Sequence, residues 1–169
     1  MGPWTKCTSA EDAGGNSNWE NIYYAYAPAS VTWGTANLYQ NDEMLSVSQY
    51  PNLTDPFYID AIDDYLSISP EKVTNTSITD SRLETLGGNE LVGSMVAVWH
   101  SPNMVSYQKI TAYDDVEESK IIFEEIGGGK VYTTTDTKYS IMNNPPATIL
   151  DKAGEYYFEE TPEGDGTHK

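Results

Sequence analysis

Short runs of β-branched and aromatic residues, separated by Gly, Pro, Asn and Asp, follow one another along most of this 169-residue chain. A helical spacing of apolar residues is nearly absent. Short apolar runs between turn-forming residues are typical of β-strands. We therefore predict an all-β fold, an antiparallel β-sandwich or barrel of about eight strands with one or two short helices.

The clearest strand prediction covers residues 91–99, whose almost continuous apolar character fits a central strand buried on both faces. Trp99 in this run is expected in the core. Asn41-Asp42-Glu43 lies between two further strand-like runs and predicts a hairpin, because Asn and Asp tolerate turn geometry. Other strands are expected within residues 22–27, 36–40, 44–49, 105–113, 121–123, 139–142 and 155–158.

The best helix prediction covers residues 79–87, where Thr79 or Asp80 can cap the first turn and Gly87 can follow the last one. Residues 52–79 are expected to be irregular, with at most a short helix or strand. Residues 1–20 are polar and Gly-rich, which predicts a flexible leader. Residues 21–169 are then expected to form a single β-rich domain.

The charge balance excludes some classes of partner. Lys and Arg total 9 against 26 Asp and Glu, which gives a formal charge of −17. Nucleic-acid binding needs a basic face, so no nucleic-acid partner is expected. The single Cys7 excludes a disulfide framework, and the lack of a long apolar run predicts no membrane span. Abundant Tyr, Thr, Asn and Gly with few basic residues is common in secreted proteins that handle polysaccharide, so we expect an extracellular or periplasmic location.

Three tryptophans are candidates for carbohydrate binding, since aromatic rings stack on the apolar faces of sugars. They lie in polar or turn-like settings, whereas Trp99 lies in an apolar run. The alternative is that they belong to the core or contact a partner domain. The three candidates are Trp4, Trp19 and Trp33.

Acidic clusters suggest calcium as a possible cofactor, because calcium takes six to eight oxygen ligands. The candidate ligands Asp55, Asp60, Asp63 and Asp64 share one irregular stretch, although none matches the spaced acidic calcium loop. The alternative is a set of solvated acidic turns, and no other cofactor is expected. Asn52 and Asn75 begin triplets that fit the glycosylation acceptor pattern, which also arises by chance in Asn- and Thr-rich chains.

No catalytic residue is predicted. Acidic pairs such as Glu124 and Glu125 are neighbours in sequence, and neighbouring residues of a strand point to opposite faces. Such pairs therefore do not converge on one substrate as glycoside hydrolysis requires. Cys7 has no nearby His, and His100 follows the predicted core strand, so we expect it in a surface turn.

Three segments carry a family resemblance. They are residues 38–52 (Leu-Tyr-Gln-Asn-Asp-Glu-Met-Leu, then Gln-Tyr-Pro-Asn), residues 91–114 (Leu-Val-Gly, Val-Ala-Val-Trp and Lys-Ile-Thr-Ala-Tyr-Asp), and residues 139–158, with Ile-Leu-Asp-Lys-Ala-Gly-Glu-Tyr-Tyr-Phe. In this order they resemble the β-rich insertion domain of right-handed parallel β-helix proteins that act on polysaccharide, such as glycoside hydrolase family 141. One departure is Asn41-Asp42-Glu43, where relatives have Asp-Gly, so the turn type stays open.

The resemblance implies a fragment of a longer chain whose β-helix would be this domain's partner. In such relatives the catalytic carboxylates lie on the β-helix, so no functional residue is carried over to this sequence. We therefore expect a non-catalytic accessory domain that packs on the β-helix and shapes its groove for a complex polysaccharide. The parent protein is expected to be a glycoside hydrolase or polysaccharide lyase. The alternative is an independent structural or adhesive module that is glycosylated and self-associates through Tyr-rich strands.

Overall fold

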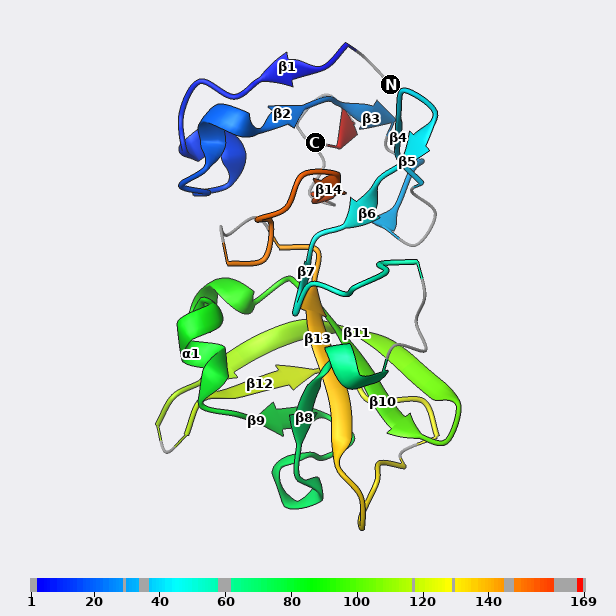
Figure 1. Ribbon diagram of the computed structural model, residues 1–169. Coiled ribbons are helices and arrows are strands. Elements are labelled where there is room, and N and C mark those ends of the chain that lie inside the picture. Colours follow the sequence, from blue (N-terminus) through cyan, green and yellow to red (C-terminus); the bar gives the residue numbers. More distant parts are fainter. Residues whose placement is uncertain are drawn as a thin grey trace. The chain divides into compact units, whose positions relative to one another are not determined.

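The computed structural model describes residues 3–28, 30–33, 37–57, 62–116, 118–128, 130–144, 148–159 and 167–168. The chain divides into two compact units, which Figure 1 shows as ribbons. The terminal unit consists of Met1–Ser48 and Pro145–Lys169, and the sheet unit consists of Gln49–Asn144. The expected boundary at residue 20 does not coincide with this division, since residues 1–20 belong to the same unit as residues 21–48. That residues 21–169 fold as one domain stays a prediction.

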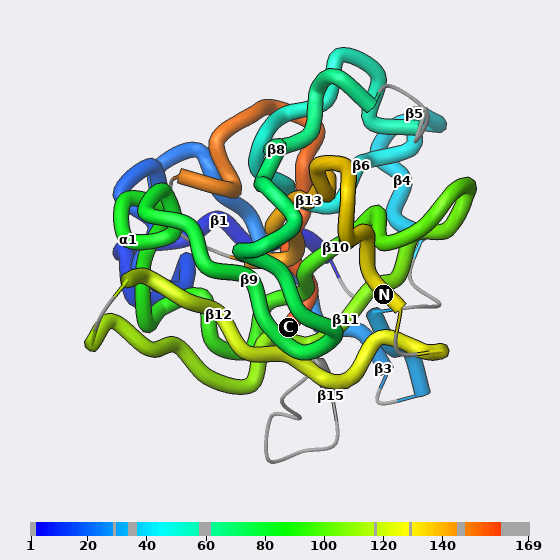
Figure 2. The backbone as a smooth tube through the Cα atoms, turned by 90° about the horizontal axis from the view of Figure 1, so that it is seen from below, coloured from blue at the N-terminus to red at the C-terminus, as the bar shows by residue number. Residues whose placement is uncertain are grey.

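An antiparallel seven-stranded sheet dominates the sheet unit and, with its few short helices, confirms the predicted all-β fold. Figure 2 shows β12 running beside β9 and β11, as their pairing requires. The order is β7 (Gln49–Tyr50), β13 (Thr137–Met142), β10 (Met95–Ser101), β11 (Met104–Asp114), β12 (Lys120–Phe123) and β9 (Ser77–Thr79), and β8 (Leu66–Ile68) also pairs with β13.

Strand β10 is the central strand that the apolar run predicts, with β11 on one side and β13 on the other. Val96 and Val98 have no exposed surface, and Trp99 is buried as expected. The Trp99 ring meets Tyr65 edge-on, with centroids 6.0 Å apart and planes at 68°. The strand begins at Met95 and not at residue 91, because the 3-10 helix η6 (Gly88–Leu91) occupies the start of the run.

The predicted helix is present as α1 (Arg82–Leu86), which buries Leu83 and Leu86. Ser81, directly before the helix, makes no side-chain capping bond. Asp80, one residue earlier, accepts the backbone N–H of Arg82 at 2.9 Å through Oδ1, in line with the prediction that Asp80 serves the first turn. Gly87 follows the helix with φ 137°, a conformation that a side chain disfavours. Both ends of the helix therefore agree with the sequence signals.

Residues 52–79 hold more regular structure than the sequence predicts. They include β8, β9 and two 3-10 helices, η4 (Ile62–Asp64) and η5 (Pro70–Lys72). Strand β9 exists because its three residues pair with β12, with Ile78 opposite Ile121. Pairing with a distant strand stabilises such a short strand, and the local sequence carries little sign of it.

The position of His100 differs from the expected surface turn. It lies within β10 and is only 2% exposed, so it is not in a surface turn. Its Nδ1 lies 2.9 Å from the backbone oxygen of Lys130, and its Nε2 lies 2.9 Å from Ser106 Oγ. Because both ring nitrogens have polar partners, burial of the imidazole costs little free energy.

The terminal unit is built from pairs of two-residue strands and short 3-10 helices. The predicted hairpin is confirmed: Asn41 and Asp42 have φ values of 51° and 67°, which is the pattern of a type I′ turn. The pairs are β1 (Thr5–Lys6) with β2 (Tyr23–Tyr24), β3 (Ala27–Pro28) with β15 (Thr167–His168), β4 (Tyr39–Gln40) with β5 (Glu43–Met44), and β6 (Ser46–Val47) with β14 (Glu155–Tyr156); the helices include η1 (Glu11–Ala13) and η2 (Trp19–Asn21).

Candidate functional site

The first twenty residues contribute a strand to the terminal unit. Strand β1 pairs antiparallel with β2, and Lys6 lies opposite Tyr23 while Thr5 lies opposite Tyr24. The Cys7 backbone N–H donates to the Ile22 oxygen at 3.0 Å and extends the pairing. Residues opposite each other in an antiparallel pair share a face, so Lys6 and Tyr23 lie on the same side of the ribbon.

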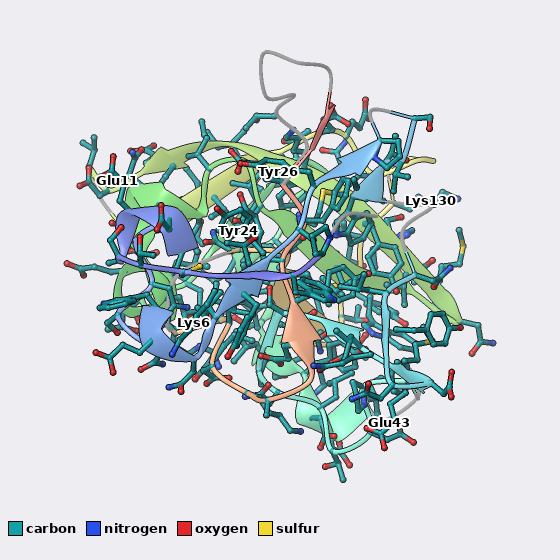
Figure 3. All side chains as sticks on the ribbon, turned by 90° about the horizontal axis from the view of Figure 1, so that it is seen from above. Lys6, Glu11, Tyr24, Tyr26, Glu43 and Lys130 are labelled. Carbon is teal, nitrogen blue, oxygen red and sulfur yellow. The ribbon has the colours of Figure 1, made fainter. Side chains whose placement is uncertain are left out.

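Trp4 lies two positions before Lys6. Trp4 directly precedes β1, and the alternation of side chains along a strand, continued one residue beyond β1, predicts Trp4 on the same side as Lys6 and Tyr23. Trp4 is 43% exposed and Tyr23 is 52% exposed, and Lys6 is exposed as well. We call Trp4, Lys6 and Tyr23 the aromatic–lysine face. Figure 3 shows the neighbouring side chains from above, with Lys6, Tyr24 and Tyr26 labelled.

The other side of the ribbon carries a pair of rings. Tyr24 and Tyr26 meet edge-on, with centroids 5.7 Å apart and planes at 79°. Such a contact contributes about 0.5–1.5 kcal/mol beyond the burial of area. It fixes the two rings relative to each other, with Tyr24 on the side of β2 opposite to Tyr23.

The three predicted tryptophans are not equally accessible. Trp4 is exposed, whereas Trp19 in η2 and Trp33 are only partly exposed, and the Trp33 indole nitrogen is buried. Exposure therefore favours Trp4 as a contact residue. Carbohydrate binding by Trp19 or Trp33 stays a prediction. The sequence did not single out Tyr23, because its exposure follows from its register with β1.

Two of the four predicted calcium ligands already accept hydrogen bonds from backbone N–H groups. Asp55 accepts the Phe57 N–H at 2.9 Å, and Asp64 accepts the Thr54 N–H at 2.8 Å. Asp63 is exposed, and Asp60 lies outside the described residues. Within the described ranges, no group of three or more His, Cys, Asp or Glu side chains is placed to hold a metal ion. The calcium site stays a prediction.

The two glycosylation candidates differ in their surroundings. Asn52 is exposed. Asn75 is partly buried, and its side-chain nitrogen donates to Glu125 Oε1 at 2.7 Å. Exposure alone therefore favours Asn52 over Asn75 as an acceptor. Modification of either residue stays a prediction.

A polar depression of about 980 Å³ lies within the sheet unit, between the α1–η6 segment and the β11–β12 connection. Lys72 and Glu118 form an ion pair at its rim, and Glu84 and Asp115 add two exposed carboxylates. The buried Tyr113 hydroxyl also lines it and has no hydrogen-bond partner among the described residues. The depression is open, and the carboxylates that line it make it acidic.

Asp80 at the edge of this depression has a structural role. Arg82 Nε donates to both carboxylate oxygens at 2.9 Å, and the Tyr139 hydroxyl donates to Oδ2 at 2.7 Å. Burial alone would raise the pKa of Asp80, but the hydrogen bonds from Arg82 and Tyr139 outweigh it and lower this pKa. Burial, followed by the Asp80 contact, raises the pKa of Tyr139. The hydrogen bonds among Asp80, Arg82 and Tyr139 therefore stabilise the fold.

A comparison of the chain with family models found no match, and comparisons with curated proteins and with solved structures found none either. The resemblance to β-helix insertion domains therefore stays a prediction that rests on the three segments of the sequence. Among the described residues, no helix has the length and apolar character needed to cross a bilayer.

Proposed function

We propose that this chain is a non-catalytic, carbohydrate-binding accessory domain of an exported protein that acts on polysaccharide. The observation that carries the proposal is the exposure of Trp4, directly before β1, and of Tyr23, which β2 places opposite Lys6. Large aromatic side chains usually bury most of their surface, so two exposed on one face suggest a binding surface.

The ribbon suits the stacking of sugar rings. Aromatic side chains offer a large contact area and have only two rotatable side-chain bonds, so little conformational entropy is lost when they bind. The backbone pairing of β1 with β2 limits their movement further. Groups held in place before binding lose less free energy on association. The aromatic–lysine face would therefore bind a glycan without rearrangement.

The wider setting of the proposal comes from the resemblance to β-helix insertion domains. In that setting, the β-helix of the same parent chain carries the catalytic carboxylates of a glycoside hydrolase or polysaccharide lyase. This domain packs on the β-helix and helps to shape the groove, outside the cell or in the periplasm. Its contribution is positional, because it keeps the polysaccharide close to the parent enzyme.

Isothermal titration calorimetry against a panel of soluble polysaccharides tests the proposal. Trp4→Ala and Tyr23→Ala should each weaken binding about tenfold or more, as expected for the loss of one aromatic anchor. Phe57→Ala is the matched control, since Phe57 is 57% exposed and belongs to the sheet unit. An absence of binding to every polysaccharide, or equal losses in all three variants, would reject the proposal.

A second function, self-association as a structural module, is supported by the β4–β5 hairpin. Tyr39 lies opposite Met44 there, and the two side chains are 58% and 42% exposed. An exposed apolar pair on a short hairpin can be covered by a second copy. Light scattering after size-exclusion chromatography separates the two functions: a dimer that Tyr39→Ser dissociates favours self-association, and a monomer favours the accessory domain.

A further inference from the structure

We propose that the glycan bound by the aromatic–lysine face is anionic, with carboxylate or sulfate groups on its sugars. This inference rests on the proposed function and specifies the chemistry of its ligand. It starts from the register of the ribbon, which places Lys6 directly opposite Tyr23. Trp4 lies two residues from Lys6 on the same side, so a sugar chain that stacks on both rings would pass the lysine ammonium.

Lys6 is exposed and has no carboxylate partner among the described residues. Lys72, in contrast, is paired with Glu118, and Lys120 Nζ lies 3.2 Å from Asp114 Oδ2. Only 9 of the 169 residues are Lys or Arg, against 26 Asp and Glu, so few cationic side chains are available to an anion, and Lys6 lies opposite an exposed tyrosine.

The ammonium group favours an anionic ligand for two reasons. A hydrogen bond from an ammonium to a carboxylate or sulfate oxygen is about twice as strong as a bond between neutral groups. A neutral sugar hydroxyl offers Lys6 no such gain to offset the loss of its strongly bound water.

The formal charge of −17 opposes a polyanion at long range. At physiological ionic strength, however, exposed charges are screened over about 8 Å. The acidic groups elsewhere on the chain therefore slow the approach of the ligand more than they weaken a contact made at Lys6. The preference for an anionic glycan is therefore expected to depend on the Lys6 side chain and not on the net charge of the chain.

Two soluble cellulose derivatives test this inference, because they share a backbone and differ in charge. Carboxymethylcellulose is anionic and hydroxyethylcellulose is neutral. At 0.15 M salt the unmodified chain should bind the anionic polymer about tenfold more tightly. Lys6→Gln should remove this preference, so that the two polymers bind with about equal affinity, and Lys6→Arg should keep it. Trp4→Ala should weaken binding to both polymers.

Lys152→Gln is the matched control, since it removes one positive charge from another exposed site of the terminal unit. Equal affinity of the unmodified chain for the two polymers overturns the anionic inference while the proposed function stands. Equal effects of Lys6→Gln and Lys152→Gln also overturn it, because net charge alone would then explain the preference. Absence of binding to both polymers overturns the inference, whereas the proposed function is rejected only when no polysaccharide of the wider panel binds.

Discussion

The Tyr139 hydroxyl donates a hydrogen bond of 2.7 Å to Asp80 Oδ2, and the two residues are 59 positions apart in the sequence. Tyr139 has no exposed surface, and Asp80 is 6% exposed. The bond links the central part of β13 to the turn that starts α1. It therefore ties the helix to the sheet through one buried polar contact.

Replacing Tyr139 by Phe should destabilise the sheet unit by about 1–3 kcal/mol, because one lone pair of a buried carboxylate loses its donor. Urea denaturation followed by circular dichroism measures the change. Tyr39→Phe is the control, since Tyr39 is 58% exposed and the same hydroxyl is removed there. A change below about 0.5 kcal/mol for Tyr139→Phe would show that the contact adds little to stability.

The lowered pKa of Asp80 predicts a loss of stability in acid. A carboxylate whose pKa is lower in the folded state stabilises the fold above its unfolded pKa of about 3.9. This stabilisation disappears as the pH falls through the folded pKa. Asp80→Asn should make the chain less stable at pH 7 and should flatten the decline below about pH 4. Melting temperatures between pH 2.5 and 7 measure both effects, and parallel curves for the two proteins would contradict the assignment.

The raised pKa of Glu155 predicts the opposite dependence of stability on pH. Burial raises its pKa to about 7, even though its carboxylate accepts the N–H groups of Asp151 and Lys152. A carboxyl whose pKa is higher in the folded state favours folding most strongly below its unfolded pKa of about 4.3. Its contribution is lost as the pH rises towards 7. Glu155→Gln should remove this decline in thermal stability, and an unchanged pH profile in the variant would argue against a buried carboxyl.

The β4–β5 hairpin predicts a stabilising change. Asp42 has φ 67°, a conformation that Gly adopts with less strain, and Asn-Gly is the preferred pair in type I′ turns. Asp42→Gly should raise the free energy of unfolding by about 0.5 kcal/mol, since the gain exceeds the entropic cost of Gly. Gly87→Ala should act in the other direction, because its φ is 137°. Denaturant midpoints measure both, and destabilisation by Asp42→Gly would contradict the turn assignment.

Parts of both units could be predicted from local patterns. The apolar run before His100, the hairpin at Asn41-Asp42 and the caps of α1 each carry their signal within a few neighbouring residues. Strands β8 and β9 could not be predicted, because three-residue strands depend on partners far away in the sequence. His100 was misplaced for a similar reason: its polar partners come from Ser106 and from the Lys130 backbone.

The candidate site was predictable only in part. Trp4 stood out because its neighbours are polar. The roles of Tyr23 and Lys6 follow from the pairing of β1 with β2, and a segment that the sequence suggested to be a flexible leader gave no sign of that pairing. Register decides which side chains share a face, and a shift of one residue would separate Lys6 from Tyr23.

The most direct test of carbohydrate binding is the dissociation constant of the Trp4→Ala variant, measured by calorimetry beside Phe57→Ala on a polysaccharide that the unmodified chain binds. The account predicts that Trp4→Ala weakens binding about tenfold or more while Phe57→Ala leaves it unchanged. Equal dissociation constants for the two variants would contradict the account, because the exposed face of the β1–β2 ribbon would then take no part in binding.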